Sequence, residues 1–309
     1  MTLLKPAACW VGVRWVPGHS AVVLMYHRVA DISFDPWRLA VSPANFAEQM
    51  DVVCKHFNPV PLAELTANPR STPRSRTVAV TFDDGYRDSL EDAKPVLERY
   101  GIPATVFVAS GYVGSSRDFW WDELERICFT GEFDSRTDVP GLDVNPALEP
   151  GDLYLDLWQQ LRSHRFDARR ELLDELEKAA RVPPTTSPNT MTTEELAELA
   201  DGGLVEIGGH TVNHPSLPML SSEEQYEEIH GSRIQLEQVV GRPVTSFCHP
   251  HGDFTRESAE LVREAGYERS CVSVPGPVRA GVDPFQIPRR RAENWRGDEF
   301  GWHLSRFFR

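Results

Sequence analysis

Two adjacent carboxylates, Asp83 and Asp84, follow an apolar run in the stretch VTFDDG. Side chains of a strand alternate between its two faces, so neighbours cannot enter one pocket while the strand stays regular. Two carboxylates held together also repel each other unless a cation or a shared proton relieves them. One interpretation is a turn that caps the next helix, with Gly85 supplying a positive φ. The other is a catalytic pair beside a bound cation.

A second chemical pattern is the pair His210 and His214 in the stretch HTVNH. Two imidazoles four residues apart on a helical turn face the same side and can bind one metal ion. Pro215 follows directly and disfavours a continuing helix, so we expect a single tight turn. Alone, this spacing is often a surface coincidence. With an aspartate from another segment, it makes a site that leaves metal positions open for water and substrate.

The segments that precede these residues have the composition of buried strands. Seven apolar, β-branched runs are expected to be strands, at residues 21–29, 77–82, 104–109, 204–209, 245–250, 269–274 and, more weakly, 284–288. Helical patterns lie between them, and Ser42, Thr192 and Ser221 each carry the signature of a helix N-cap. Strands that alternate with helices predict a parallel sheet covered by helices, either doubly wound or closed into a barrel.

Functional groups of parallel α/β folds gather at the carboxyl ends of the strands. Five of the ten histidines lie at the ends of the expected strands, together with two aspartates and three arginines. These residues are His27, His210, His214, His249 and His251, Asp83 and Asp84, and Arg289, Arg290 and Arg291. The strand ends should therefore bring carboxylates and imidazoles to one edge of the sheet.

Two stretches break the alternation of strands and helices, at residues 131–152 and 181–191, and they bracket an amphipathic helix expected over 153–180. Both are rich in Pro, Gly, Asp and Thr, whereas a plain connection between a strand and a helix needs only a few residues. We therefore predict a single domain over residues 1–309, with a helical insertion at about 115–190 that lies over one end of the sheet.

Charge and cysteine content exclude some partners and compartments. The 309 residues carry a net charge of −14, which argues against nucleic acid or an anionic membrane as the main partner. The five cysteines are widely spaced and form no CxxC pair, which favours a reducing compartment. The N-terminal apolar patch is interrupted by Arg14 and is too short to span a bilayer, so we expect a cytoplasmic protein without a transmembrane segment.

The motifs TFDDG, HTVNH and CHPHG resemble, in this order, the first three motifs of the NodB-homology polysaccharide deacetylases, carbohydrate esterase family 4. The stretches MYHRV, SPANF and GYRD are similar to that family as well. The resemblance covers roughly residues 20–110 and 190–290 and leaves the insertion uncovered. It implies a distorted (β/α)7 barrel and a metal-dependent hydrolase that removes an acetyl group from a sugar or glycan.

Carried over to this sequence, the resemblance makes Asp83 the catalytic base and Asp84, His210 and His214 the ligands of a divalent metal. Zinc is favoured, with cobalt and nickel as alternatives for the same ligands. A bound zinc ion lowers the pKa of its water from about 15.7 to about 7, and Asp83 would take the proton. The implied substrate is a carbohydrate with an acetylated amino sugar. Attack on its amide carbon–nitrogen bond is favoured over an O-acetyl ester, and peptide bonds are not expected substrates.

The sequence departs from the family pattern in two places. Cys248 stands where the family has an arginine that steadies the base, and Arg28 or one of the arginines at 289–291 could supply that charge. The histidine of the last motif, the usual general acid, is absent from PFQIPRR. His251 and His27 are the candidates to replace it. His27 could equally be a hydrogen-bonded residue of the barrel mouth.

Substrate contacts are expected near the oxyanion site and from aromatic side chains. His251 replaces a tyrosine whose backbone N–H holds the oxyanion in the family, and the substitution preserves that backbone group. Exposed tryptophans can stack on sugars, although most tryptophans are core residues or loop anchors. The candidates for substrate contact are His27, Pro250, Trp120 and Trp121, with Trp37 and Trp295 less favoured.

Two other classes of function compete with a deacetylase. A catalytically weak or silent glycan-binding barrel gains support from the missing arginine and the missing terminal histidine, but the base and the metal ligands are complete. A phosphotransferase or phosphatase would need a DxD spacing or a glycine-rich phosphate loop, and the sequence has neither. The exact sugar and the oligomeric state stay open.

Overall fold

The computed structural model describes residues 21–67, 76–134 and 137–308. Its main sheet is parallel throughout, with the strand order β10-β9-β8-β7-β6-β5-β1-β11. The strands are β1 (Ala21–Tyr26), β5 (Thr77–Phe82), β6 (Ala104–Val108), β7 (Val205–Gly209), β8 (Ser246–Cys248), β9 (Arg269–Val272), β10 (Ile287–Pro288) and β11 (Arg290–Arg291). Beside them, β4 (Asn58–Pro59) pairs with β5, and β2 (Arg28–Val29) pairs with β3 (Ala40–Val41).

The sheet closes through one short segment near the C-terminus. β10 pairs with β9 and β11 pairs with β1, and only Arg289 separates these two short strands. Both edges of the sheet are therefore joined by a single stretch of chain, which makes a nearly closed barrel. All seven expected strands are present, and the predicted distorted (β/α)7 barrel is confirmed.

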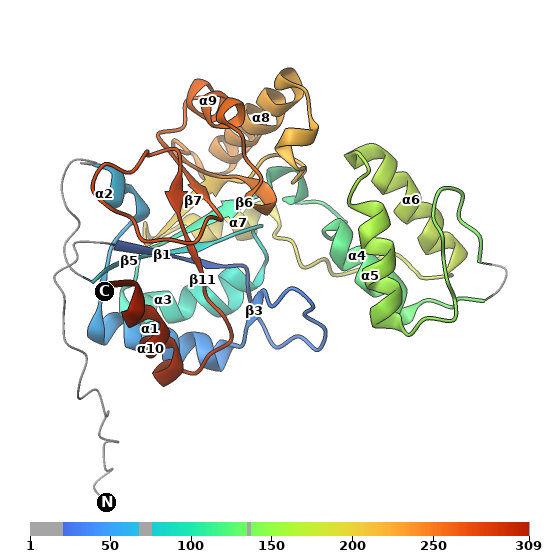
Figure 1. Ribbon diagram of the computed structural model, residues 1–309, viewed down its shortest axis with the longest axis horizontal. Helices are drawn as coiled ribbons and strands as arrows, with labels where there is room; N and C mark the ends of the chain where they lie inside the picture. Colours follow the sequence, from blue (N-terminus) through green and yellow to red (C-terminus); the bar gives the residue numbers. More distant parts are fainter. Residues whose placement is uncertain (1–20, 68–75, 135–136, 309) are drawn as a thin grey trace, which may run out of the picture.

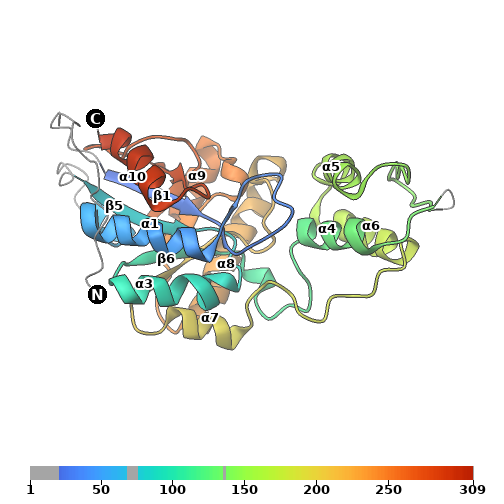
Figure 2. The same cartoon turned by 90° about the horizontal axis from the view of Figure 1, so that it is seen from below.

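Helices surround this sheet on its outside (Figures 1 and 2). They are α1 (Pro43–His56), α2 (Leu62–Ala67), α3 (Lys94–Tyr100), α7 (Thr193–Ala200), α8 (Ser222–Val240), α9 (Arg256–Glu264) and α10 (Gly297–Ser305). The predicted helix starts are confirmed. Ser42 caps α1 with Pro43 in its first turn, and Thr192 and Ser221 form capping boxes at α7 and α8.

Strand residues alternate between the barrel interior and the surrounding helices. On β5, Val78 and Val80 belong to the cluster that packs against the helices, whereas Ala79 belongs to a separate inner cluster. Phe107 fills this interior over Gly208, where a Cβ atom would lie 2.5 Å from the phenylalanine ring. Inward-facing positions further along each strand reach the mouth of the barrel, and there the functional side chains assemble.

The insertion forms a helical lobe beside the barrel, at the right of Figures 1 and 2. It contains α4 (Trp120–Thr130), α5 (Pro150–Leu161) and α6 (Phe166–Ala179). Its apolar side chains form their own buried cluster, in which Leu124, Leu157 and Leu173 are almost completely buried. The lobe therefore has a hydrophobic core that is separate from the two clusters of the barrel.

The single helix expected over 153–180 is wrong, because α5 and α6 are separate helices joined at residues 162–165. Arg169 stabilises the break. Its guanidinium donates hydrogen bonds to the carbonyl oxygens of Leu161 and His164, at 3.1 and 2.7 Å, and so satisfies the end of α5. The resulting hairpin lets both helices turn an apolar face toward the lobe core.

Some of the predictions fall on residues outside the described ranges. Cys9 and the N-terminal apolar patch, on which the cytoplasmic prediction depends, lie there. The other four cysteines, Cys54, Cys128, Cys248 and Cys271, are free thiols. Among the described helices, none has the length and apolar character needed to cross a membrane.

The separate cores lead to a first prediction, that Leu157→Ala loosens the lobe and leaves the barrel intact. Leu157 is fully buried in the lobe cluster, where truncation of a leucine costs about 2–5 kcal/mol. Amide hydrogen exchange should therefore become faster in α4, α5 and α6 while β5 and β7 keep their protection. The matched control, Val106→Ala in the barrel cluster, should speed exchange in β5 and β7. Equal loss of protection in both parts with Leu157→Ala would make the insertion part of the barrel core.

Candidate active site

Asp83 and Asp84 reach one site because the chain turns sharply after β5. Asp83 continues the inward face of the strand, two residues after Thr81. Asp84 has a left-handed backbone with φ of +74°, and Gly85 follows with φ of +89°, so the alternation of the strand ends here. A Cβ atom on Gly85 would lie 2.9 Å from Val108, which demands glycine at this position. The predicted turn with a positive φ at Gly85 is confirmed, but neither aspartate caps a helix, since the next helical turn, Ser89–Ala93, begins after Asp88 and has no side-chain cap. The turn brings both carboxylates into the barrel mouth, where a catalytic pair beside a cation remains the prediction.

His210 and His214 lie on a tight turn after β7 that is not helical. Thr211 and His214 have left-handed backbones, with φ of +65° and +54°. The Thr211 hydroxyl accepts a hydrogen bond from the His214 amide at 3.0 Å, and the Glu228 carboxylate accepts from the two amides between them. Such a backbone costs about 1–3 kcal/mol and is typical of functional sites. The strained turn places both imidazoles over the barrel mouth.

The three predicted metal ligands meet at one buried point. Oδ1 of Asp84 lies 3.5 Å from Nε2 of His210 and 3.2 Å from Nε2 of His214. The three residues are at most 5% exposed, and their ligand atoms lie within 4.8 Å of one another. Two imidazoles and one carboxylate are a common zinc ligand set with positions left for water and substrate. The residues present therefore fit a divalent cation.

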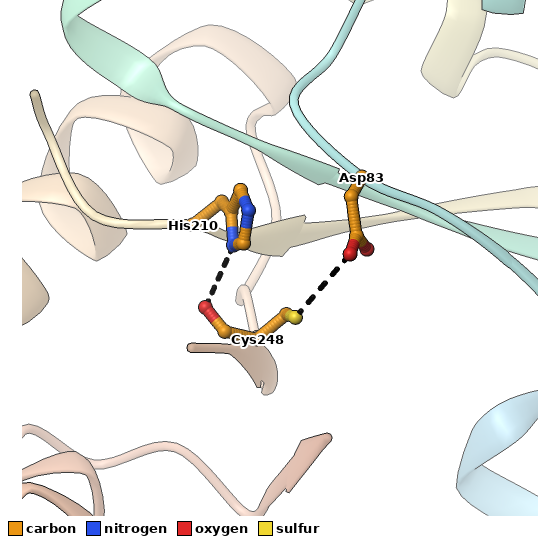
Figure 3. A group of neighbouring side chains, drawn as sticks. All are labelled: Asp83, His210 and Cys248. Carbon is orange, nitrogen blue, oxygen red and sulfur yellow. Dashed lines mark hydrogen bonds between the residues drawn. The ribbon is translucent and has the colours of Figure 1, made fainter. Parts of the chain in front are cut away.

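The hydrogen bonding of His210 also fits a cation. Its Nδ1 lies 2.7 Å from the carbonyl oxygen of Cys248 (Figure 3), and Nδ1 is the donor because a carbonyl can only accept. In the neutral ring, the lone pair of Nε2 then faces the carboxylate of Asp84. Two electron-rich groups in a buried site repel each other unless a positive charge lies between them. The same bond to a backbone carbonyl orients the ring as metal-binding histidines require.

The pKa values of Asp84, His210 and His214 also indicate a site that favours positive charge. Burial alone would raise the pKa of Asp84, but hydrogen bonds from His210 and His214 lower it well below its ordinary value. Burial opposes the charged form of His210, yet the neighbouring Cys248 and Asp84 raise its pKa well above the ordinary value. For His214 burial prevails, and its pKa is lowered. The cluster thus attracts positive charge to the space around Asp84.

Asp83 is held by Arg289, the residue between β10 and β11. Nη1 of Arg289 donates to Oδ1 of Asp83 at 2.6 Å, and Nη2 donates to Oδ2 at 2.7 Å. This two-pronged ion pair is buried, since Asp83 is 3% and Arg289 1% exposed. Burial alone would raise the pKa of Asp83, but Arg289 lowers it below the ordinary value. The carboxylate therefore stays charged at neutral pH.

Among the arginines considered for the charge missing at position 248, Arg289 is the one that contacts Asp83. The small side chain of Cys248 leaves room for the guanidinium, whose Nη2 lies 2.9 Å from the cysteine sulfur. Arg28 lies elsewhere, and its Nε donates to Asp88 at 2.6 Å. The positive charge beside the aspartate thus comes from the segment that closes the barrel.

A second cluster with metal-ligand spacing contains Asp83, His210 and Cys248 (Figure 3). Two features argue against a metal there. Arg289 already occupies both oxygens of Asp83, and burial raises the pKa of Cys248 to about 11, which keeps the thiol protonated. The cluster of Asp84 with the two histidines is the better cation site.

The remaining strand-end histidines have three different surroundings. Nε2 of His27 lies 3.9 Å from Oδ2 of Asp83, at the edge of the site. The ring of His251 lies 4.5 Å from that of His214 and faces the cleft, yet the surrounding protein and His214 lower its pKa well below the ordinary value. His249 does not line the cleft, and burial lowers its pKa to about 3. His27 and His251 therefore stay candidates for contact with substrate.

A cleft of about 980 Å³ lies between the barrel and the lobe, and its lining includes His27, Asp83, Asp84, His210, His214 and His251. Trp121 lines it, with its Nε1 donating to the Tyr86 hydroxyl at 2.7 Å and its ring 5.0 Å from that of His214. Trp120 lines it as well, but it is 5% exposed and belongs mostly to the lobe core. Trp295 instead stacks on His303, with ring centres 4.0 Å apart, and does not line the cleft.

Trp158 is not among the tryptophans that the sequence predicts at the substrate site, yet it also lines the cleft. It lies on α5, inside an amphipathic stretch where a tryptophan is expected in the core. No sequence pattern marks its position, because the break at 162–165 that ends α5 beside the cleft depends on hydrogen bonds from Arg169 to backbone carbonyls. Pro250 is buried at the end of β8, next to His251, and its ring is not among the cleft-lining residues.

The ion pair predicts that Arg289→Met lowers stability most at neutral pH. Removing one partner of a buried ion pair costs about 3–5 kcal/mol, because the other charge is left buried and unpaired. Without Arg289, burial raises the pKa of Asp83, so protonation on acidification relieves part of the cost. Thermal unfolding in the presence of a chelator should show a large deficit near pH 7 that shrinks near pH 5.

Arg290→Met is the matched control, because the guanidinium of Arg290 lies 3.9 Å from the centre of the Phe307 ring and takes no part in the ion pair between Arg289 and Asp83. It should lower the melting temperature little and equally at both pH values. In wild type, the contribution of Asp83 to stability changes with pH in the opposite direction. Its pKa is lowered in the folded protein, so this contribution is lost as the pH falls. A deficit of Arg289→Met that is independent of pH would show that Asp83 is not the charge left unpaired.

Comparison with known proteins identifies relatives of the chain. A family profile described as polysaccharide deacetylase matches residues 70–138 and 160–270, more than half of the chain. The poly-β-1,6-N-acetyl-D-glucosamine N-deacetylase of Staphylococcus aureus is 30% identical over 149 residues, 41% of this chain and 51% of the relative. YxkH of Bacillus subtilis, named among the polysaccharide deacetylases, is 20% identical over 244 residues, 79% of this chain and 61% of the relative. The chain thus spans less than two thirds of these relatives.

Solved structures share the fold. The deacetylase PplD of Streptococcus pyogenes has a TM-score of 0.63 at 17% identity, covering 94% of this chain and 98% of its own. IcaB of Ammonifex degensii has a TM-score of 0.62 at 20% identity, covering 93% and 97%. The family profile includes both TFDDG and HTVNH, the motifs whose side chains meet at the barrel mouth. By sequence motif, site geometry and fold, the chain belongs to the polysaccharide deacetylase family.

Proposed function

We propose that this protein removes N-acetyl groups from the amino sugars of a glycan by metal-dependent hydrolysis. The observation that carries the proposal is the meeting of Asp84, His210 and His214 beside the ion-paired carboxylate of Asp83. A relative named as an N-deacetylase of poly-β-1,6-N-acetyl-D-glucosamine supports the choice of an amide over an ester. Zinc is the favoured metal, since imidazole and carboxylate ligands suit it.

A divalent cation at these ligands would polarise the acetyl carbonyl and make a water molecule acidic. Asp83 is the base that accepts a proton from that water. Arg289 keeps the pKa of Asp83 low, so this carboxylate is a weak base and suits only an acidified water. Each carboxylate oxygen has a second lone pair, so Asp83 can accept a proton while the two hydrogen bonds from Arg289 persist.

Departure of the amine requires a proton, because an unprotonated amide nitrogen is a poor leaving group. His251 faces the cleft beside His214 and is the proposed donor, with His27 as the second candidate. Donation requires the protonated ring, whereas burial and the neighbouring His214 lower the pKa of His251. The proton that Asp83 has accepted is therefore a competing source. The backbone N–H of His251 is proposed to face the oxyanion.

The test of this function combines metal analysis with acetate release. Wild-type protein should bind a divalent metal and release acetate from N-acetylated amino-sugar oligomers. Asp84→Ala, His210→Ala and His214→Ala should each lose metal and activity but keep the fold, since the ligands lie at the barrel mouth and outside the hydrophobic clusters. Asp83→Asn should keep the metal and lower kcat about 10²–10⁴-fold.

Several outcomes would contradict these assignments. Stoichiometric metal and near-normal turnover in any ligand variant would remove that residue from the ligand set. Loss of the metal in Asp83→Asn would exchange the roles of the two aspartates. Wild-type protein that binds metal and glycan but releases no acetate from a broad panel would favour a glycan-binding barrel.

The proton donor has its own test. If His251 protonates the leaving group, His251→Gln should slow amide substrates more than matched ester substrates, because an alkoxide leaves with less help from an acid. The kcat ratio of the amide and the ester form of one sugar measures this selectivity. His27→Gln is the matched variant. Selective loss in His27→Gln alone would move the donor to the end of β1, and equal loss on both substrates in both variants would favour return of the proton from Asp83.

A further inference from the structure

A second, smaller pocket of about 50 Å³ lies where the helical lobe joins the barrel. It is lined by the connection between β6 and α4, by α4 itself and by the first two turns of α6. None of Asp84, His210 and His214 lines it, so this pocket is separate from the site at the barrel mouth. Roughly 10–15 Å³ of such space holds one water molecule, so the pocket has room for one small ligand.

A buried arginine without an acidic partner lines this pocket. Arg169 is 8% exposed, and it forms no ion pair with a carboxylate of the described residues. Its hydrogen bonds go to the backbone carbonyl oxygens of Leu161 and His164. Its guanidinium also lies 4.6 Å from the centre of the Trp120 ring. Carbonyl dipoles and an aromatic face compensate a buried charge only in part.

The pKa of Arg169 agrees with an uncompensated charge. Burial lowers it below its ordinary value, and among the neighbouring side chains only Tyr112 raises it. Arg117, another arginine of the pocket, has a raised pKa, because Glu123 and Asp174 accept its hydrogen bonds. An arginine stays charged at neutral pH in either case. A negative partner for Arg169 would therefore stabilise the folded protein.

The carboxylates that line the pocket have other partners. Both oxygens of Glu123 accept hydrogen bonds from Arg117, at 2.7 and 2.6 Å. Asp118 accepts a hydrogen bond from the backbone amide of Asn189. Neither carboxylate is among the groups that shift the pKa of Arg169. The charge of Arg169 is therefore left for a ligand to neutralise.

The pocket combines free hydrogen-bond donors with apolar surface. Arg169 donates to the carbonyls through Nε and Nη2, so its Nη1 has no partner among the described residues, and the hydroxyl of Tyr112 has none there either. Trp120, Phe166 and Leu173 supply apolar walls. A carboxylate accepts two parallel hydrogen bonds from a guanidinium, and a short apolar tail suits the remaining walls. Phosphate or sulfate would need donors around all of its oxygens.

We propose that this pocket binds a small monocarboxylate, whose charge neutralises Arg169 and whose apolar end packs on Trp120 and Phe166. Acetate is one such ion and is the product of the proposed reaction, but the site rests on the unpaired charge of Arg169 and not on that reaction. An occupied site holds α6 against the connection after β6, since the walls come from both. Arg169, Trp120 and Phe166 also line the large cleft, so the two cavities share these side chains as a common wall.

The experiment is an NMR titration of the isotope-labelled whole chain, in which sodium acetate replaces sodium chloride at constant ionic strength. The amide signals of Ser115, Phe166 and Arg170 should shift and saturate. The Kd should be millimolar, because a ligand of so few atoms can gain little binding energy. Phosphate should bind at least about tenfold more weakly, since it matches the donors less well. No substrate is present, so the result does not depend on whether the chain is a deacetylase.

Variants locate the ligand in the pocket. Arg169→Met should abolish the saturable shifts, but it also removes the hydrogen bonds at the end of α5. Tyr112→Phe and Arg170→Gln keep those bonds and should each weaken acetate binding about three- to tenfold, through loss of one donor or one nearby charge. Arg162→Met is the matched control. It removes an arginine of the lobe that lines the cleft but not the pocket, so the affinity should not change.

Shifts that stay linear up to high acetate, or phosphate that binds as tightly as acetate, would indicate general attraction of anions and overturn the carboxylate site. Loss of affinity in Arg162→Met, with Tyr112→Phe and Arg170→Gln unchanged, would place acetate in the cleft and also overturn it. Saturable binding that Tyr112→Phe and Arg170→Gln weaken, and that Arg162→Met preserves, supports the site even if Arg169→Met opens the hairpin of α5 and α6.

Discussion

A buried ion pair between Arg289 and Asp83 ties the closure of the barrel to its chemistry. Arg289 is the single residue between β10 and β11, and these two short strands join the edges of the sheet. A charged group buried without a partner costs several kcal/mol, so the closing segment and the charged state of Asp83 depend on each other. The same guanidinium contacts Thr81 and Cys248, which belong to two further strands. One side chain thus fixes the strand ends that surround Asp83.

The ion pair also separates two carboxylates that are neighbours in the chain. Both oxygens of Asp83 face a fixed cation of the protein, whereas Asp84 faces the imidazoles of His210 and His214. Neighbouring titratable groups take different roles when their surroundings differ in this way. The left-handed backbone at Asp84 makes the difference possible, because a regular strand would have turned its carboxylate toward the helices.

Much of this site can be predicted from the sequence, because strand ends and period-two alternation determine where Asp83 and His210 point. The contact of Arg289 with Asp83 cannot be predicted from strand ends or from alternation. The last strand is short and interrupted, and its register is determined by pairing with β9 and β1 at once, so no periodicity distinguishes the three arginines at 289–291. The position of Trp158 beside the cleft cannot be predicted from the sequence pattern either. The break after α5 depends on carbonyl contacts of Arg169, a tertiary effect that amphipathic spacing does not contain.

The lobe has a hydrophobic cluster of its own, and a further small cluster joins it to the barrel, with Tyr86 and Ala109 on the barrel side and Trp121 and Phe166 on the lobe side. The lobe has its own buried cluster, so its outer end can vary without disturbing the ion pair of Asp83. The end of the lobe that faces the barrel tolerates less change, because it contacts residues of the site. Tyr86 follows the turn of Asp84 and Gly85, and its hydroxyl accepts a hydrogen bond from Trp121 of the lobe, whose ring also lies against His214. The position of the first lobe helix is therefore coupled to the turn that carries Asp84, and substitutions near Trp121 should alter the geometry of that turn as well as the cleft.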